Sequence, residues 1–379
     1  MAHLHLTQDA VHVAGAGPAG LATAIALTRA GRRVVVHEAH PTVGARFRRD
    51  LQGLENWTTD EDVLEWLRRL GITTAFAARP CHAGTAFDAR GRAYAVRSRL
   101  PLFYMVERGP DAGSLDAALL AQARALGAEV RFGSRLDRLG GVGVLALGPR
   151  AADAIAVGYH FNTTMRDGFW ILCDDDVAPK GYAYLLVMNG RGTVKSCMFA
   201  DFKRESLCVE RTVAAFERLA DLKMVAPQRH GGVGNFRVPD SALSGGHPLA
   251  GEQAGFQDTL WGFGMRFAIT SGVLAARSVL EGIDYDALWR RELMPWLQAS
   301  VVNRVLYERC GNGGYVWLLR AQRSSGDARR FLRWLYRPGF ATRLLLPWAR
   351  ARYRSRRHDL ACNHADCTCI WCRCRDEYA

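Results

Sequence analysis

The stretch VHVAGAGPAGLATAIALTRAGRRVVVHEAH, residues 11–40, decides the fold class. A short apolar run is followed by closely spaced glycines, by an alanine- and leucine-rich segment and by a second apolar run. This order predicts a strand over residues 11–14, a glycine turn, a helix over residues 21–30 and a strand over residues 33–38. Two strands joined by a helix in this way are the unit of an α/β fold with a parallel sheet.

The glycines of this turn have the spacing of a dinucleotide site. Gly15, Gly17 and Gly20 form Gly-x-Gly-x-x-Gly between the predicted strand and the predicted helix. Such a turn lets a pyrophosphate approach the backbone at the helix N-terminus. Glu38 ends the next strand, where its carboxylate can accept hydrogen bonds from ribose hydroxyls. FAD or NAD therefore fits, and NADP fits poorly because its 2′-phosphate favours an arginine; a structural unit without a ligand is the alternative.

A second segment, GEQAGFQDTLWGFGMRFAITSGVLAA at residues 251–276, bears on which dinucleotide is bound. It resembles the second flavin-binding segment of enzymes with a glutathione-reductase-like FAD domain, whose usual text is Gly-Asp-Ala-Ala-Gly. The resemblance implies that FAD is held by Gly251, Glu252, Gly262 and Gly264, with Glu252 in place of the family's Asp. We expect a helix over residues 265–280 whose N-terminus points at the flavin and stabilises negative charge. A helix with glycines that serve packing alone is the alternative.

Within that superfamily, residues 11–293 resemble the geranylgeranyl reductase family. The motifs are RGPDAGSLDAALLAQARALGAEVRFG at residues 108–133, GVLALG at residues 143–148 and DDDVAPKGYAYLLVMNGRG at residues 174–192. The resemblance implies that Arg46 and Arg108 lie near the flavin. Phe47 stands where the family has a cysteine, so a mechanism that uses this thiol is not expected.

The third motif departs from the family at the positions that line its substrate tunnel. Tyr184 replaces a Trp, and Leu186 and Val187 replace Phe-Pro. The resemblance implies hydride transfer from reduced flavin to a carbon–carbon double bond of an isoprenoid or lipid-like substrate, with NAD(P)H or another donor reducing the flavin. Tyr182 and Tyr184 are candidates for the proton donor, although a tyrosine at such a position more often serves as a wall of the pocket. A monooxygenase or a desaturase acting on a hydrophobic metabolite is the alternative function.

The order of the predicted elements divides the chain into four parts. Residues 1–150 and 239–284 form a discontinuous Rossmann-like FAD-binding domain, and residues 151–238 form an inserted antiparallel β-sheet that binds substrate. Residues 285–357 are helical and basic, and residues 358–379 form a cysteine-rich tail. The fold class is α/β. No apolar run is long enough for a membrane helix, and the first ten residues lack the features of a signal peptide, so we expect a cytoplasmic protein.

The formal net charge of +13 is concentrated near the C-terminus. Residues 320–357 hold twelve arginines and one acid, Asp327. Such a segment can contact the phosphates of a lipid surface or of a nucleic acid, or it can be a solvated helical face. Motifs that read nucleic-acid bases are absent, and Trp and Leu accompany the arginines. We therefore expect peripheral contact with a membrane and no binding of a specific nucleic acid.

The cysteine-rich tail, CNHADCTCIWCRC, is a candidate metal site. Five cysteines fall within the last eighteen residues: Cys362, Cys367, Cys369, Cys372 and Cys374. Zinc takes four thiolates, and so does an iron–sulfur cluster. The spacing matches neither standard pattern, and a tail with reactive thiols and no metal is the alternative.

Overall fold

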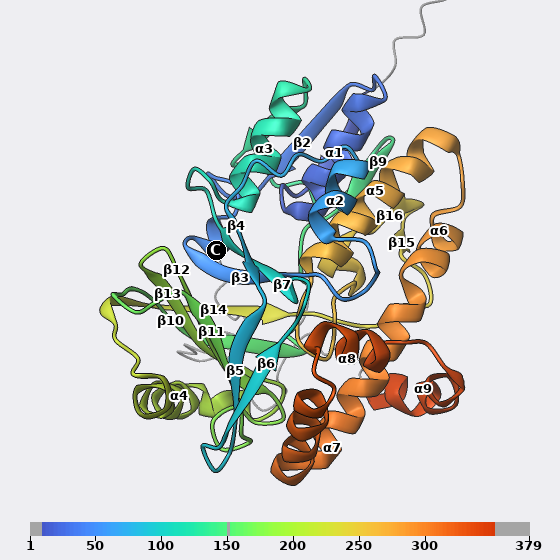
Figure 1. Cartoon of the computed structure of the whole chain (residues 1–379). Helices are drawn as coiled ribbons and strands as arrows, with labels where there is room; N and C mark the ends of the chain where they lie inside the picture. The colour runs from blue at the N-terminus through green and yellow to red at the C-terminus, as the bar shows by residue number, and fades with distance from the viewer. Residues whose placement is uncertain (1–9, 150–151, 353–379) are drawn as a thin grey trace, which may run out of the picture.

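The computed structural model describes residues 10–149 and 152–352. Four parallel strands form the first sheet in the order β8-β2-β1-β9 (Figure 1). They are β1 (Val11–Ala14), β2 (Val34–Glu38), β8 (Glu129–Phe132) and β9 (Gly143–Leu145). The strands and the parallel pairing predicted for residues 11–40 are confirmed. The intervening helix α1 (Pro18–Arg29) begins three residues earlier than expected, because Pro18 occupies its first turn, where no N–H is needed.

Helix α5 (Met265–Glu281) packs directly on α1, although some 240 residues of chain separate them. A Cβ atom at Gly272 would lie 2.2 Å from the carbonyl oxygen of Ala19, so only glycine allows this approach. The Thr23 hydroxyl donates a hydrogen bond of 3.0 Å to the Gly272 carbonyl. The 3-10 turn η3 (Gly251–Ala254) and the short strands β15 (Leu243–Ser244) and β16 (His247–Pro248) lead into this helix.

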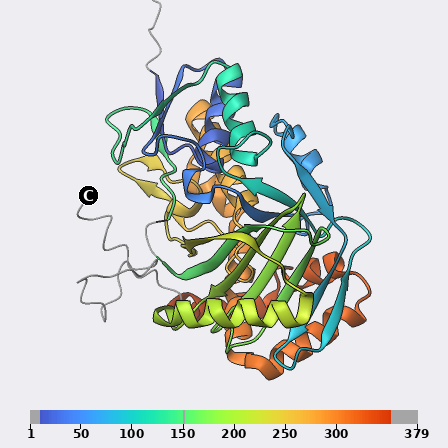
Figure 2. The same ribbon diagram turned by 90° about the vertical axis from the view of Figure 1, so that its left-hand side faces the viewer.

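The second sheet has seven strands in the order β14-β10-β13-β12-β11-β5-β6. Their bounds are β5 (Ala83–Asp88), β6 (Ala93–Arg97), β10 (Ala154–Asn162), β11 (Gly168–Cys173), β12 (Tyr182–Met188), β13 (Arg191–Met198) and β14 (Val225–Gly234). All its pairs are antiparallel except β11 with β5. The sheet is therefore not confined to residues 151–238, since β5 and β6 come from the N-terminal segment. Helix α4 (Glu205–Ala220), preceded by η2 (Phe202–Arg204), lies along the outer face of this sheet (Figure 2).

A three-stranded sheet, which the sequence did not predict, lies between these two sheets. It has the order β3-β7-β4 and comprises β3 (Asp50–Glu55), β4 (Ala78–Cys81) and β7 (Phe103–Arg108). A 3-10 turn η1 (Ala45–Phe47) precedes β3, and the helices α2 (Val63–Arg69) and α3 (Leu115–Ala125) complete this part. The sheet brings the segment around residue 50 against the seven-stranded sheet.

The C-terminal region is helical as expected. It comprises α6 (Tyr285–Glu292), α7 (Met294–Ser324), α8 (Ala328–Leu335) and α9 (Phe340–Arg352). Helix α7 is broken at Gly311, where φ is 55° and ψ is −165°. Among residues 10–149 and 152–352, no helix has both the length and the apolar character needed to cross a membrane. The five cysteines of the predicted metal site lie outside the described residues.

Candidate active site

A single cavity of about 450 Å³ extends from the glycine turn of β1–α1 to the C-terminal helices. Gly15, Gly17 and Glu38 line one end of it. Leu318 of α7 and Phe331 of α8 line the other. Residues from all three sheets and from α5 contribute to the walls, so the cavity joins the predicted dinucleotide site to the predicted substrate sheet.

The three glycines of the turn have three different structural roles. Gly15 has φ +102°, and a Cβ there would lie 2.2 Å from the Ala146 carbonyl oxygen. A Cβ at Gly20 would lie 1.9 Å from the Gly15 carbonyl oxygen, so Gly20 permits the close packing of helix and strand. At Gly17 the backbone is ordinary, with φ −74°, and a Cβ would meet nothing within 4 Å. Protein packing therefore does not require a glycine at position 17, whereas a ligand held against the backbone there would.

Glu38 lies beside this turn, at the end of β2. Its Oε2 accepts a hydrogen bond of 2.9 Å from the Ala16 amide, and its Oε1 accepts one of 3.0 Å from the His40 amide. These bonds fix the carboxylate at the mouth of the turn. Each carboxylate oxygen can accept more than one hydrogen bond, so the group can also accept from two vicinal hydroxyls.

The second predicted segment lies on the same cavity. Gly251, Glu252, Gly262 and Gly264 all line it, and α5 begins there directly after Gly264. The first turn of a helix leaves amide groups without intrahelical partners, and these favour negative charge. The structure thus brings together both glycine segments, which are more than 200 residues apart in the chain.

Two buried polar atoms on this part of the wall lack partners. The Gln257 Oε1 and the Trp261 Nε1 have no hydrogen-bond partner among the described residues, and both residues line the cavity. An unpaired buried donor or acceptor costs free energy. These atoms fit a site in which a polar, planar ligand completes the hydrogen bonding, as an isoalloxazine ring would.

Arg108 and Arg46 both lie on the cavity wall. The buried Arg108 forms a bidentate ion pair with Asp116, with Nε and Nη2 at 2.7 and 2.8 Å from the carboxylate oxygens. Its Nη1 donates to the Gln52 Oε1 at 3.0 Å. Both arginines lie over the ring of Phe47, with the guanidinium carbons of Arg46 and Arg108 at 5.3 and 4.8 Å from its centroid. Arg108 is therefore a rigid support, and Arg46 is the more exposed of the two cations.

Tyr182 and Tyr184 lie on β12 and line the cavity from the side of the seven-stranded sheet. The Tyr182 phenol donates a hydrogen bond to the Trp261 carbonyl oxygen. Burial raises the pKa of both phenols well above the ordinary value, so both stay protonated at neutral pH. Because the Tyr182 proton is already donated within the protein, Tyr184 is the better placed of the two proton-donor candidates.

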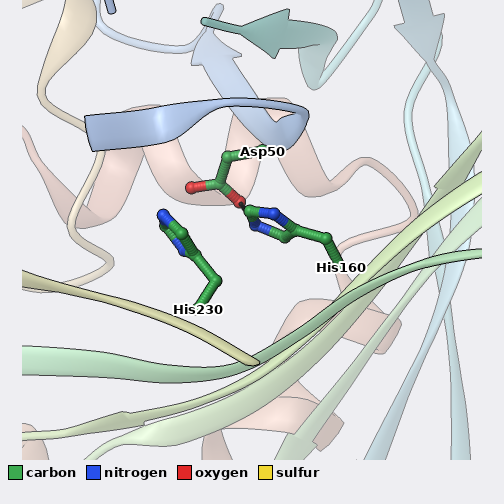
Figure 3. Close-up of side chains that lie close together, drawn as sticks. All are labelled: Asp50, His160 and His230. Carbon is green, nitrogen blue, oxygen red and sulfur yellow. Dashed lines mark hydrogen bonds and ion pairs between the residues drawn. The ribbon is translucent and has the colours of Figure 1, made fainter. Parts of the chain in front are cut away.

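A buried ionic cluster on the cavity wall was not predicted (Figure 3). Asp50, the first residue of β3, accepts from the Lys195 ammonium at 2.7 Å through both carboxylate oxygens. His160 Nε2 donates to the Asp50 Oδ1 at 3.1 Å, and the His160 ring stacks on the ring of His230 with centroids 4.1 Å apart. His230 Nε2 donates to the Arg46 carbonyl oxygen at 2.8 Å. The cluster thus connects the turn η1 to the seven-stranded sheet.

Charge balance decides what this cluster is. Burial alone would raise the pKa of Asp50, but the Lys195 ammonium and the His160 hydrogen bond outweigh it and hold that pKa below its usual range. Burial lowers the pKa of His230 to about 4, so His230 is neutral at pH 7. Although Asp50, His160 and His230 hold donor atoms within 4.8 Å of one another, Lys195 already neutralises the one carboxylate. We therefore interpret the cluster as a buried ion pair and not as a metal site.

Two cysteines also line the cavity. Burial raises the pKa of Cys173 and that of Cys197 to about 11, so both are neutral thiols at pH 7. The sequence placed them among ordinary core or surface thiols. For β13, which carries Cys197, the sequence offers one signal of a functional site: Lys195 is a charged residue within the otherwise uncharged run GTVKSCM.

Comparisons with known proteins agree with this architecture. A model of the NAD(P)-binding Rossmann-like domain matches residues 13–58. No curated protein matches the sequence. A geranylgeranyl bacteriochlorophyll reductase-like protein from Thermoplasma acidophilum has a similar structure, with a TM-score of 0.68 and 17% identity over 83% of this chain and 91% of that chain.

Two other solved structures are similar over most of their length. The flavin-dependent brominase Bmp2 has a TM-score of 0.60 and 15% identity over 85% of this chain and 96% of that chain. The p-nitrophenol 4-monooxygenase PnpA from Pseudomonas putida has a TM-score of 0.58 and 15% identity over 87% of this chain and 98% of that chain. The expected α/β fold is thereby confirmed: the chain has a Rossmann-like dinucleotide-binding fold that it shares with a reductase-like protein, a brominase and a monooxygenase.

Proposed function

We propose that the protein is an FAD-dependent oxidoreductase that reduces carbon–carbon double bonds of a hydrophobic, isoprenoid or lipid-like substrate. The observation that carries this proposal is the single cavity that joins the glycine turn and the α5 N-terminus to an apolar end formed by α7 and α8. The names of the structural neighbours support a flavoprotein, since one is a geranylgeranyl bacteriochlorophyll reductase-like protein and another is a flavin-dependent brominase.

The chain would hold FAD through two groups of residues, one at the glycine turn after β1 and one at the segment that leads into α5. The open backbone at Gly17 and the carboxylate of Glu38 suit the pyrophosphate and the ribose. Gly251, Glu252 and the α5 N-terminus at Gly264 suit the ribityl chain and the ring. Bound FAD supplies hydride transfer at its N5 atom.

An apolar part of the wall suits the hydrocarbon chain of a substrate. Trp57, Phe103, Phe169, Leu186 and Phe331 line the cavity beyond the flavin side. Such a wall excludes water and orients a hydrocarbon chain by shape. Arg108 keeps the opposite wall rigid through Asp116, and Tyr184 would give the proton that the second carbon of the double bond needs.

The experiment begins with the absorption spectrum of the purified protein after incubation with FAD. The protein is then reduced with dithionite under anaerobic conditions and mixed with geranylgeranyl diphosphate as the prenyl probe. We expect the oxidised flavin spectrum to return without oxygen, together with a product that carries two additional hydrogens. NADH and NADPH are compared in the same way as reductants of the bound flavin.

Two results would overturn the proposal in different ways. A protein that binds no FAD would refute the cofactor assignment. A flavin that is reoxidised only when oxygen is admitted, with oxygen incorporated into an added hydrophobic substrate, would support the monooxygenase alternative. Formation of a new double bond, with electrons passing to the flavin, would support the desaturase alternative.

A further inference from the structure

We propose that helices α7, α8 and α9 form a docking surface for an anionic lipid bilayer. The helices gather at one end of the molecule, remote from α3 and β2 (Figure 1). The view in Figure 2 places the same helices at the lower end. We define the α7–α9 surface by five of the exposed apolar side chains of these helices: Trp317, Trp334, Phe340, Leu344 and Trp348.

These side chains are exposed to a degree that is unusual for their size. Phe340 is 82% exposed, Leu344 68%, Trp317 66% and Trp334 64%. On α9, Phe340, Leu344 and Trp348 recur every four residues, so they share one face of that helix. A helix that turns large apolar residues outward at this spacing has the pattern of an interfacial helix.

Three of the five apolar side chains are followed by an arginine three residues later in the sequence. Arg320 follows Trp317 by three residues, Arg337 follows Trp334 by three, and Arg343 follows Phe340 by three. All three arginines are exposed, and no ion pair joins them to another residue of the described chain. Trp317 and Arg320 lie in α7, and Phe340 and Arg343 lie in α9, where residues three apart are neighbours on the helix surface. Arg337 lies two residues beyond the end of α8, and its amide donates a hydrogen bond of 3.1 Å to the Trp334 carbonyl oxygen. The surface therefore combines cations and apolar side chains on the same faces.

The single acid of residues 320–352 does not offset this charge. Asp327 caps α8 by accepting from the Arg330 amide at 3.1 Å, and it also accepts from the Ser98 hydroxyl at 3.2 Å. Its carboxylate is thus engaged within the fold. A surface with this positive excess and with exposed Trp and Leu matches the charge and the apolar depth of an anionic bilayer. The phosphates of a nucleic acid could bind the arginines, but a nucleic acid offers no apolar environment for the exposed side chain of Leu344.

The α7–α9 surface adjoins the apolar end of the cavity. Leu318, next to Trp317 in α7, lines the cavity, and so does Phe331, whose ring lies 6.0 Å from that of Trp334. Docking would therefore bring the apolar end of the cavity to the bilayer, from which a membrane-dissolved substrate could enter. This last step rests on the proposed function; docking itself does not.

The test is co-sedimentation of the full chain with vesicles of phosphatidylcholine, with and without phosphatidylglycerol. We expect binding to the anionic vesicles at least about tenfold tighter than to the neutral ones, weakened by added salt, with a blue shift of tryptophan fluorescence. Trp334→Ser combined with Phe340→Ser should reduce binding to anionic vesicles at least about fivefold. Val142→Ser removes an apolar side chain that is 50% exposed before β9 and serves as the matched control.

Three results would overturn the proposal. Wild-type protein could fail to bind anionic vesicles, or the double variant could bind them as tightly as Val142→Ser does. The same variants could instead abolish a concentration-dependent self-association measured by light scattering, which would make the surface a contact between copies of the chain. An unchanged melting temperature and FAD content show that the variants fold, and because no turnover is measured, the outcome is independent of the proposed reaction.

Discussion

Substitution of Gly17 by alanine separates ligand binding from folding at the glycine turn. The backbone at Gly17 is in an ordinary extended conformation, and an added Cβ would meet no atom of the described chain within 4 Å. Replacing glycine where alanine fits without strain stabilises a protein by about 0.4–1 kcal/mol, because it restricts the unfolded chain. We therefore expect the ligand-free Gly17→Ala variant to be as stable as the wild type or slightly more stable.

Binding of FAD should respond in the opposite direction. The methyl group would project into the cavity at the point where the pyrophosphate approaches the helix N-terminus. Losing one charge-assisted hydrogen bond costs about 1.5–3 kcal/mol, which corresponds to a weakening of about 10- to 150-fold. Flavin fluorescence quenching gives the dissociation constant, and thermal unfolding without FAD gives the stability.

Two control variants complete this experiment. Gly141→Ala adds a Cβ that also meets nothing within 4 Å but does not line the cavity, so it should affect stability as Gly17→Ala does and leave FAD binding unchanged. Gly20→Ala places a Cβ 1.9 Å from the Gly15 carbonyl oxygen and should destabilise the fold itself. The reasoning is refuted if Gly17→Ala binds FAD as tightly as Gly141→Ala does, because the pyrophosphate could not then lie against this turn.

Three further predictions concern titratable groups on the cavity wall or beside it. Lys195→Met leaves the Asp50 carboxylate buried and uncompensated, so chemical denaturation should show that the free energy of unfolding falls by about 3–5 kcal/mol. Adding Asp50→Asn in the same chain should restore part of this loss, and a loss below about 1 kcal/mol would contradict the buried ion pair. Because the pKa of His230 is lowered to about 4, the unfolded chain takes up a proton at this residue between pH 6.5 and pH 4 while the native state does not. Across this window the free energy of unfolding of the wild type should fall by about 3 kcal/mol relative to that of His230→Gln. The same pH dependence of stability in both proteins would exclude the lowered pKa. Burial raises the pKa of Cys197 to about 11, whereas Cys310 is exposed. In the native protein at pH 8, iodoacetamide should therefore label Cys310, and it should label Cys197 only after unfolding, as measured by peptide mass spectrometry. Equal labelling rates of the two thiols in the native protein would contradict the buried position of Cys197.

Elements whose signal lies within a dozen consecutive residues could be predicted from the sequence. The turn at Gly15 and Gly20 follows from local backbone sterics, since a Cβ at Gly20 would meet the Gly15 carbonyl oxygen and a Cβ at Gly15 would meet Ala146, directly after the adjacent strand β9. Helix α5 and the strands β10 to β13 follow from periodicity and from turn residues between them. For this reason the α/β fold class and both glycine segments of the cavity were open to prediction.

Only the tertiary structure decided the features that depend on long-range pairing. Asp50 and Lys195 are 145 residues apart, and the sequence around each residue gives no indication that it pairs with the other. The strands β5 and β6 join the seven-stranded sheet through one parallel pair between β5 and β11, which no turn signal could indicate. The apolar end of the cavity likewise exists only because α7 packs against β5 and β6 and α8 packs against α7. Local sterics and periodicity determine which elements form, whereas the packing of distant elements determines which side chains meet in the cavity.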